Sequence, residues 1–391
     1  YGRHGILGSS EVSNAPWMQM KNFGSSSLPP ESTKLTCGIW RFSPLSGIVE
    51  MVCEGTTNPW GMDWDDHGNL FFINTVIGHL WQAIPNAHLQ RMYGEDSDPY
   101  AYELLPQIAD HVHWDSSAED WRETRKGPPS GGTDAAGGGH AHSGLMIYQA
   151  DQWPEEYRGN VFALNLHGRR INRDFLKPTG SSFVASHGPD MVYWQDPWFR
   201  GLDISQAPDG SAVVIDWSDI GECHDDDGVH RTSGRIYRIS YENENQVPFK
   251  DQMEILSRMY YSRSKGDKPV VTGKEVISIL SHPNSWFTQQ FLKMGGLSAL
   301  EVEFKALEPV YELAMQAPKD FRSPEARFEV TKQLRALWAL GAVDSRKFIS
   351  LLRKDQHESV HCWAAKKLLD GFDRPGLCLL YTSDAADDTP C

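Results

Sequence analysis

Short apolar runs separated by polar turns fill the first 245 residues. Residues 70–73, 161–164, 212–215 and 235–239 are the clearest runs, and each is rich in β-branched or aromatic side chains. Glycine, asparagine or aspartate stands beside each run. Runs of this length between turn residues are typical of strands. The pattern predicts a mainly β fold for this part of the chain.

One strand–turn–strand pattern recurs along the same region. Residues 59–73 read Pro-Trp-Gly-Met-Asp, a polar turn and an apolar run, and residues 197–215 repeat the Pro-Trp, a Gly-Leu-Asp and the apolar run. A weaker copy covers residues 144–163. Recurring antiparallel hairpins favour a β-propeller over a single sandwich, because radial repetition leaves only short, protected strand edges. We therefore expect a partial β-propeller over residues 1–245.

Apolar positions take up helical spacing in the C-terminal part. A helix is expected from the Ser323-Pro324 start to Gly341, and further helices follow it. Short amphipathic helices in tandem predict an all-α, HEAT-like solenoid over residues 273–372, and a plain helical bundle is the alternative. Residues 246–272 are expected to be a polar linker. The apolar positions that support these helices are Val330, Leu334, Leu337, Phe348, Ile349, Leu351, Leu352, Val360, Ala364 and Leu368.

Residues 94–139 form a long polar excursion that does not fit a compact blade. They contain His111, His113, Trp114 and Trp121 and then a glycine-rich stretch. Long excursions of this kind are usually functional or disordered. We expect a loop with a short helix or two that crosses one face of the propeller.

The two ends of the chain look unlike natural termini. The sequence opens on Tyr1 with no basic-then-apolar leader, which is typical of a fragment. Residues 377–391 resemble translated sequencing-adapter sequence, so we leave them out of the fold prediction as a non-native tail.

The net charge, the length of the apolar runs and the cysteine spacing argue against several classes of function. The net charge is −15, from 37 Lys+Arg and 52 Asp+Glu, so binding to nucleic acid is not expected. No apolar run approaches the roughly 18 residues of a membrane span.

Cys37 and Cys53 flank a predicted hairpin centred on Leu45 that would set them opposite each other, as a disulfide or as two small buried hydrophobes. No Cys-x-x-Cys-His occurs, so no covalent haem site is expected in this chain.

Two segments concentrate residues that could carry chemistry. In Gly-Gly-Gly-His-Ala-His-Ser-Gly, residues 137–144, His140 and His142 share parity and can point into one site, although a solvated rim is the alternative. Residues 216–231 are strongly acidic and include a Cys-His pair, which suits calcium through oxygen or zinc through Cys and His, or a solvated loop. The candidate metal ligands there are Asp216, Asp219, Glu222 and His224.

A third set of residues is cationic or hydrogen-bonding. Arginine forks hold the carboxylates of anionic cofactors or orient sugar hydroxyls, although most surface arginines do neither. The candidates for cofactor binding are Arg200, Arg169, Arg170 and His167.

Several motifs together resemble one protein family. They are Asn-Pro-Trp-Gly-Met-Asp-Trp-Asp at 58–65, Asn-Thr-Val-Ile-Gly-His at 74–79, Tyr-Gly-Glu-Asp at 93–96, the histidine segment at 137–144, Asn-Leu-His-Gly-Arg-Arg at 165–170 and Asp-Trp-Ser-Asp-Ile-Gly-Glu-Cys-His at 216–224. As a set they resemble the membrane-bound dehydrogenase family of planctomycetes and related bacteria. That family is similar to the glucose/sorbosone dehydrogenase propellers, which use pyrroloquinoline quinone (PQQ) with calcium. Its members often carry HEAT repeats and a downstream c-type haem domain.

The resemblance implies a calcium-assisted, PQQ-type oxidoreductase that oxidises a sugar or related alcohol. His142 would be the general base with His140 beside it, Arg200 would lie in the quinone-binding segment, and 216–222 would be the acidic loop. Electrons would pass to a downstream c-type haem domain or a cytochrome, in a periplasmic or otherwise extracytoplasmic protein. The alternative function is a non-enzymatic propeller that binds glycans or a partner, with stacking surfaces at Trp60, Trp81, Trp198 and Trp217.

Overall fold

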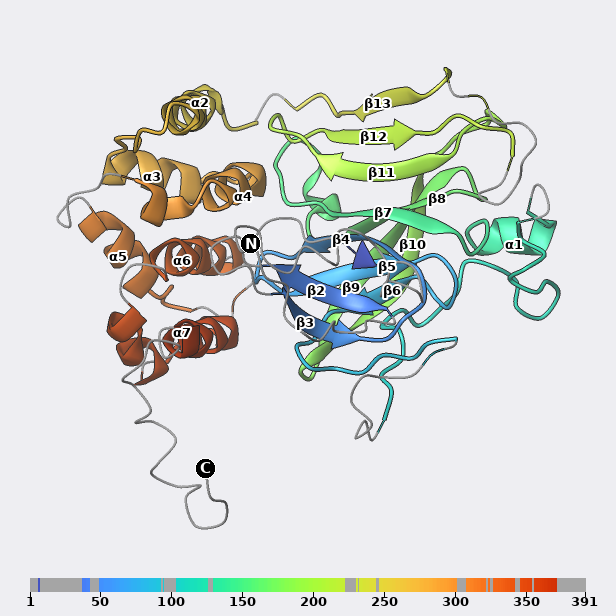
Figure 1. Cartoon of the computed structure of the whole chain (residues 1–391), viewed down its shortest axis with the longest axis horizontal. Coiled ribbons are helices and arrows are strands. Elements are labelled where there is room, and N and C mark those ends of the chain that lie inside the picture. Colours follow the sequence, from blue (N-terminus) through green and yellow to red (C-terminus); the bar gives the residue numbers. More distant parts are fainter. Residues whose placement is uncertain are drawn as a thin grey trace, which may run out of the picture. The chain divides into compact units, whose positions relative to one another are not determined.

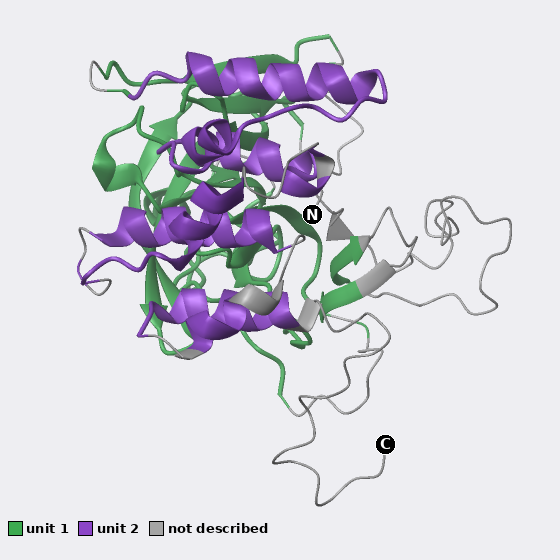
Figure 2. Ribbon diagram, turned by 90° about the vertical axis from the view of Figure 1, so that its left-hand side faces the viewer, with its two compact units in different colours: residues 1–246 green, residues 247–391 purple. Residues whose placement is uncertain are grey.

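The chain divides into two compact units, residues 1–246 (unit 1) and 247–391 (unit 2), which are coloured separately in Figure 2. The computed structural model describes residues 6–7, 37–42, 49–92, 94, 103–125, 129–221, 230, 232–243, 246–300, 307–320, 323, 326–341, 345–353 and 355–370.

Unit 1 is built from antiparallel sheets, which confirms the mainly β prediction (Figure 1). The predicted runs at 70–73, 161–164, 212–215 and 235–239 all lie in strands. In strand order the sheets are β1 (Ile6–Leu7), β2 (Gly38–Phe42) and β3 (Val49–Glu54); β4 (Pro59–Trp64), β5 (Leu70–Asn74) and β6 (Leu80–Gln82); β10 (Ser182–Tyr193), β9 (Arg170–Thr179), β8 (Val161–Asn165) and β7 (His142–Ile147); and β11 (Gly201–Gln206), β12 (Ala212–Asp216) and β13 (Arg235–Ile239).

The first strands of successive sheets pack against one another, so that β7 lies between β4 and β11 (Figure 1). A glycine in a bulge makes each approach possible. A Cβ atom at Gly61 would lie 2.9 Å from the backbone nitrogen of Leu145, and one at Gly144 would lie 2.6 Å from the Cα atom of Asp203. The Oδ2 atom of Asp63 also accepts a hydrogen bond of 2.9 Å from the backbone of Ile147. The recurring Gly in the repeated motif is therefore a point of backbone contact between neighbouring copies.

The hairpin of β7 and β8 is buried on both faces. Met146 and Phe162 pack into one apolar cluster with the β11–β12 hairpin, whereas Leu145 and Val161 pack into another with β5. Alternate side chains along a strand point to opposite faces, so one hairpin contributes to two cores. This is why its strands consist of almost continuous apolar residues.

The first hairpin corrects the predicted cysteine pairing. Cys53 lies opposite Ile39 rather than Cys37 for two reasons. The hairpin pairs Phe42 with Val49, one residue away from a turn centred on Leu45, and a bulge after Ile39 shifts the register by one residue more. Both thiols are free and buried. Burial raises the pKa of Cys53 to about 12. Leu45 and the turn around it fall outside the described residues.

The polar excursion runs between two sheets. Ile108 donates its backbone N–H to Leu80 beside β6, and Ala185 of β10 donates to Ile108 and accepts from Asp110, each at 2.9 Å. Residues 103–125 therefore bridge β6 and β10. The short helix α1 (Gly131–Ala136) follows, capped by the side chain of Ser130.

Unit 2 is helical. The predicted linker at 246–272 is wrong, because helix α2 (Lys250–Ser264) buries Ile255, Leu256 and Met259 in the core of this unit. The many charged residues of α2 make its apolar periodicity hard to recognise in the sequence. The other elements are α3 (Gly273–Leu280), α4 (Ser285–Lys293), α5 (Glu308–Met315), α6 (Arg327–Leu340) and α7 (Glu358–Asp370), with 3-10 turns η3 (Gly296–Ala299) and η6 (Ser345–Arg353).

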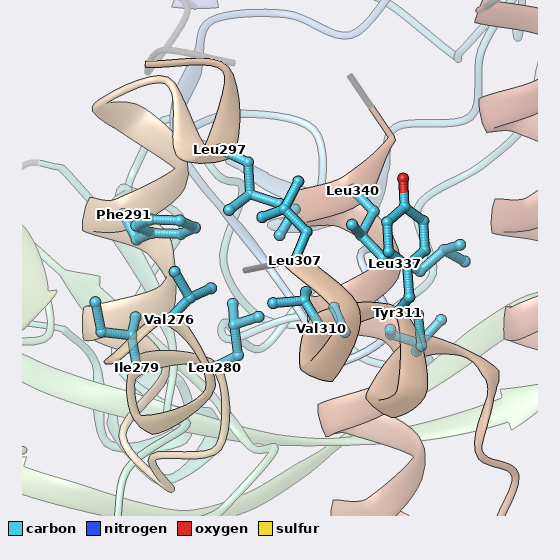
Figure 3. Close-up of a cluster of buried hydrophobic side chains, with 14 of the residues drawn as sticks. Val276, Ile279, Leu280, Phe291, Leu297, Leu307, Val310, Tyr311, Leu337 and Leu340 are labelled. Atoms are coloured by element: carbon cyan, nitrogen blue, oxygen red, sulfur yellow. The ribbon is translucent and has the colours of Figure 1, made fainter. Parts of the chain in front are cut away.

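The core of unit 2 joins several helices around α3 and α6. Figure 3 shows Val276 and Ile279 of α3, Val310 of α5 and Leu337 of α6 within one cluster. Most of the predicted apolar positions are buried, namely Val330, Leu334, Leu337, Phe348, Leu351, Val360, Ala364 and Leu368. Ile349 and Leu352 are exposed instead, at 41% and 42%. Helix α6 begins at Arg327 and its N-cap residue, Ala326, makes no side-chain cap, so the expected start at Ser323-Pro324 is wrong. Within the described part of the chain, no helix has the length and apolar character needed to cross a membrane.

Candidate functional site

A cavity of about 220 Å³ lies at the N-terminal ends of three first strands in unit 1. We call it the tryptophan pocket. Trp60 of β4, His142 of β7 and Leu202 of β11 are each the first or second residue of their strands. The pocket is therefore built where three neighbouring sheets begin. Its lining also includes Asn58, Trp121, Arg125, His140, Arg200, Trp217 and Asp219.

The aromatic side chains of the pocket are partly open to solvent. Trp60 is 45% exposed and Trp217 is 53% exposed. Trp121 packs edge-on against His140 with ring centres 5.4 Å apart. Aromatic walls with a few fixed polar groups are the usual composition of a small-molecule site.

His140 presents a lone pair in this pocket. Its Nδ1 atom contacts the hydroxyl of Thr124, and that hydroxyl donates its own proton to the carbonyl of Trp121. The ring proton of a neutral His140 therefore sits on Nδ1, which leaves Nε2 as an acceptor. Burial, with His167 and Arg125 nearby, lowers the pKa of His140 to about 3. Among the described residues, Nε2 has no hydrogen-bond partner.

His142 also touches the pocket, but both of its ring nitrogens are engaged inside the protein. Its Nε2 atom lies 2.7 Å from Nδ1 of His113 and 3.1 Å from Oδ1 of Asn172. Its Nδ1 atom lies 3.1 Å from the carbonyl of His140. Burial, and then the charge of His79, hold the pKa of His142 well below its usual range.

The three glycines before His140 bring the backbone against other side chains. Gly137, Gly138 and Gly139 all have positive φ values, between 102° and 130°. A Cβ atom at Gly137 would lie 2.6 Å from the ring of His113, and one at Gly139 would lie 3.0 Å from His167. The glycine run therefore lets the chain pack closely on two imidazoles.

Arg200 organises the wall of the pocket. Its guanidinium donates to the backbone carbonyls of Pro197, Phe199, Ile220 and Gly221, at 2.8 to 3.0 Å. These contacts hold the segment that follows β12 against the start of β11. The guanidinium of Arg200 is thus hydrogen-bonded to backbone carbonyls of the segments that form this side of the pocket.

The other predicted cofactor residues lie outside the pocket lining. Arg169 donates to the hydroxyl of Tyr193 at 3.2 Å. Arg170 is buried and forms ion pairs with Asp134 and Asp190. His167 is buried with its ring packed edge-on against His140, 4.6 Å between ring centres.

The predicted acidic loop is described only at its start. Asp216 is buried in an ion pair with Arg235 and also accepts from the backbone of Arg200 and Ser218. Asp219 lines the pocket, and its Oδ1 atom accepts from the backbone of Gly221. Glu222 and His224 lie outside the described residues.

A second group of polar side chains touches the pocket residue His142. We call it the histidine cluster, and it consists of His79, His111, His113 and Asp174. One donor atom from each of these side chains lies within 4.8 Å of the others. His142 and His187 touch the cluster through His113, at 2.7 and 3.1 Å. His113 and Asp174 are fully buried and His111 is partly exposed.

The members of the cluster come from distant parts of the chain. His79 directly precedes β6, Asp174 lies in the middle of β9, and His111 and His113 come from the bridging segment 103–125. His111 and His113 stood out in the polar excursion at 94–139, but the sequence assigned them no role. The available signal was that His111-x-His113 repeats the His-x-His spacing of His140 and His142.

Electrostatics within the cluster follow from burial and mutual contact. Burial penalises the charged form of Asp174, but His79, His111 and His187 outweigh that penalty and hold the pKa of its carboxyl well below its usual range. Burial also opposes protonation of His111, but Asp174 and Asp110 outweigh it and raise its pKa. Burial and the charges of His79 and His142 lower the pKa of His113 strongly.

Comparison with solved structures finds partial likenesses to sugar dehydrogenases. A glucose dehydrogenase from Thermus thermophilus is 17% identical with a TM-score of 0.31, and the match covers 49% of this chain and 47% of that one. The PQQ-bound form of an aldose sugar dehydrogenase from Streptomyces coelicolor is 16% identical with a TM-score of 0.30, over 51% and 47% of the two chains. The chain thus spans about half the length of these structures.

Comparison with sequences gives a family. No curated protein matches the sequence. The profile described as "Domain of unknown function (DUF7133)" matches residues 17–243, which is more than half of the chain and includes every described residue of the pocket and of the histidine cluster. On this match the chain belongs to the DUF7133 family.

Proposed function

We propose that unit 1 is the substrate-binding part of an oxidoreductase that acts on a sugar or a related alcohol, and that the tryptophan pocket receives the substrate. The observation that carries this proposal is the neutral imidazole of His140, whose Nε2 atom has no hydrogen-bond partner among the described residues, in a pocket that the exposed side chains of Trp60 and Trp217 also line. Oxidation of a hydroxyl requires a group that accepts its proton.

The roles of the pocket residues follow from their contacts. Trp60 and Trp217 offer flat apolar faces on which a sugar ring can lie, while Asn58 and Asp219 offer hydrogen-bonding groups. His140 then accepts the hydroxyl proton at Nε2. We assign this role to His140 rather than His142, because both nitrogens of His142 are engaged in the interior.

We also propose PQQ as the cofactor that accepts electrons. When bound, it supplies a two-electron acceptor for the substrate. Its flat ring would lie against the tryptophan faces, and Arg125 would pair with one of its carboxylates. Arg125 contacts the ring of Trp121 at 5.8 Å, whereas the guanidinium of Arg200 is already bonded to backbone carbonyls.

Calcium does not fit the described lining. Calcium takes about six to eight oxygen ligands. Asp219 is the one carboxylate of the described lining, and Asp216 is paired with Arg235. We therefore derive no step through calcium, and its expected ligands Glu222 and His224 stay a prediction.

The wider expectations are part of the same proposal. The sheets with adjacent first strands would be consecutive blades of a β-propeller, and unit 2 would be a HEAT-like solenoid. Electrons would pass on to a c-type haem domain or a cytochrome in an extracytoplasmic compartment.

A second candidate function is a non-enzymatic module that binds glycans. The exposure of Trp60 and Trp217 favours it, since stacking faces alone suffice for carbohydrate binding.

One set of measurements separates the two candidates. The full chain is titrated with PQQ, with and without calcium, and assayed for dye reduction on a panel of sugars and alcohols. Under the oxidoreductase proposal, PQQ binds, a sugar drives dye reduction, and His140→Gln lowers the rate by about 100-fold or more. The matched control is His67→Gln, in the turn at the opposite end of β4 from Trp60.

Sugar binding without PQQ binding or dye reduction, weakened by Trp60→Ala, would establish the glycan-binding module instead. A folded chain that binds neither PQQ nor any sugar would overturn both proposals.

A further inference from the structure

We propose that the histidine cluster of unit 1 binds a divalent first-row transition metal ion, with zinc as the first candidate. The site is separate from the acidic loop at 216–231 and does not depend on the activity proposed for the pocket. Its ligands would be His79, His111, His113 and Asp174.

The donor atoms are already close to metal-binding positions. Nε2 of His79 lies 2.7 Å from Oδ2 of Asp174, and Nε2 of His111 lies 3.2 Å from Oδ1 of Asp174 and 3.1 Å from Nε2 of His113. Zinc bonds of about 2.0–2.1 Å to nitrogen and oxygen place tetrahedral ligand atoms about 3.3 Å apart. The four donor atoms all lie within 4.8 Å of one another, so the most widely separated of them would approach by up to about 1.5 Å to complete a tetrahedral site.

The placement of ring protons also favours a cation. Nδ1 of His111 lies 2.9 Å from a carboxylate oxygen of Asp110, so the proton of that ring belongs on Nδ1. Nδ1 of His113 faces Nε2 of His142, whose own proton is directed at the carbonyl of His140. In the neutral form of His111, its Nε2 atom and that of His113 would be two lone pairs 3.1 Å apart, which a cation between them would stabilise. A protonated His111 would instead donate from Nε2 to Asp174 or His113, and the metal titration below distinguishes the two states.

The contacts of His111 and His113 with Asp110 and His142 resemble those that surround the ligands of a metal site. Metal-binding imidazoles usually donate their second ring N–H to a carboxylate or another acceptor, which fixes the ring orientation. Asp110 does this for His111, and His142 does it for His113. The carbonyl of His140 in turn accepts the proton on Nδ1 of His142, at 3.1 Å.

Among the described residues, imidazoles alone pair with the buried carboxylate of Asp174. It is 2% exposed, and within the described part of the chain its ion-pair partners are the imidazoles of His79, His111 and His187, with no lysine or arginine. Its Oδ1 atom accepts no hydrogen bond from the described residues. A buried charge of this kind is stabilised by pairing or by a metal.

The chemistry of the donor set selects the class of metal. Imidazole nitrogen suits zinc, copper, iron and nickel, whereas calcium and magnesium take oxygen. Four protein ligands in a buried position are typical of a closed, structural zinc site. Such an ion would fasten the bridging segment, through His111 and His113, to β6 and β9.

The test uses the full chain without a histidine tag. The purified protein is analysed for metal by mass spectrometry, stripped with a chelator, and titrated with Zn²⁺ and with Co²⁺, whose visible absorption reports the coordination geometry. We expect an equimolar amount of zinc, displaced by cobalt with a tetrahedral spectrum, and a higher melting temperature when metal is bound.

Variants locate the site. His111→Gln and Asp174→Asn should each weaken zinc binding by about 100-fold or more, and His111→Cys should restore it with a new sulfur-to-cobalt absorption band. The control is His140→Gln, which should keep the metal. Folding of each variant is checked by circular dichroism.

Folded wild-type protein that neither contains nor takes up zinc or cobalt would show that the cluster is a metal-free hydrogen-bond network. Metal binding that persists unchanged in both His111→Gln and Asp174→Asn would place the ion elsewhere. Either result overturns the proposal.

Discussion

The Nε2 atom of His142 lies 2.7 Å from the Nδ1 atom of His113, and this contact joins the wall of the tryptophan pocket to the histidine cluster. A single strand residue at the start of β7 thus belongs to two sites. The other contacts of His142, to Asn172 and to the backbone of His140, fix its ring between them.

The first prediction concerns this contact. His142→Ala should lower the affinity for zinc by about 10- to 100-fold, because it removes the group that orients His113. The measurement is a competition titration against a chelator of known affinity. His67→Gln, in the β4–β5 turn, should have no effect. Unchanged zinc affinity in a folded His142→Ala protein would show that His113 is oriented by other contacts.

The second prediction concerns the approach of β7 to β11. Gly144→Ala should lower the free energy of unfolding by about 3 kcal/mol or more, since its Cβ atom would lie 2.6 Å from the Cα atom of Asp203. Gly180→Ala is a matched control, because Gly180 has nearly the same φ, 62° against 61°, and open space around its Cβ position. That control should cost only about 1–2 kcal/mol.

Urea unfolding of both variants gives the comparison. The difference between the two variants isolates the steric conflict from the backbone strain. Equal losses at the two positions would mean that the strands move apart at no cost.

The third prediction is a dependence of stability on pH. His140 has a pKa of about 3 in the folded chain, below the value of about 6.5 in the unfolded chain. The unfolded state therefore binds a proton that the folded state does not, and stability falls as the pH drops from about 6.5 towards 3. The contribution of this residue is about 1.4 kcal/mol per pH unit in that window, and it is absent above the window.

His140→Gln removes this contribution, so its melting temperature should fall less steeply than that of the wild type between about pH 6 and pH 4. Identical slopes for His140→Gln and the wild type would contradict the buried, neutral state of His140.

The fourth prediction concerns unit 2. Arg335 of α6 is 1% exposed and donates to the backbone carbonyls of Leu280 and His282, at 3.3 and 2.6 Å, just where α3 ends. Arg335→Ala should destabilise the protein by about 3–5 kcal/mol, because it leaves a cavity and buried carbonyl groups that lose a charged donor.

Arg327→Ala is the comparison on the same helix, where the side chain is exposed, and it should change stability by less than about 0.5 kcal/mol. Both are measured by urea unfolding followed by circular dichroism, which reports the helical unit. Similar effects at the two arginines would show that the buried hydrogen bonds of Arg335 add little.

Local patterns were enough to predict most strands and several helices. The runs around Phe72, Val161 and Val214 form strands because their side chains are branched or aromatic and turn residues surround them. Helix α2 was not predicted, because charged residues surround its few apolar positions in the sequence. The buried ones are Ile255, Leu256 and Met259. The predicted register of Cys37 and Cys53 was wrong because the sequence marks neither the exact centre of the hairpin turn nor the bulge after Ile39.

The two sites differ in how far the sequence revealed them. His140, His142, Arg200 and Asp219 were chosen from dense polar segments, and all four line one pocket. The histidine cluster was not foreseen, because its members lie as far apart in the sequence as His79 and Asp174. His79 ends one of the motifs of the family resemblance, but no local pattern marks Asp174 or links the two. Only the folding of the bridging segment between β6 and β10 brings them together.

That bridging segment has a thermodynamic consequence. Residues 103–125 provide His111 and His113 to the cluster and Trp121 and Arg125 to the pocket. An ion that orders one end of the segment lowers the entropic cost of ordering the other. Zinc and sugar should therefore favour each other's binding by the same factor in both directions, as reciprocity between coupled sites requires. A chain deprived of its ion would then lose affinity for sugar with every pocket residue intact.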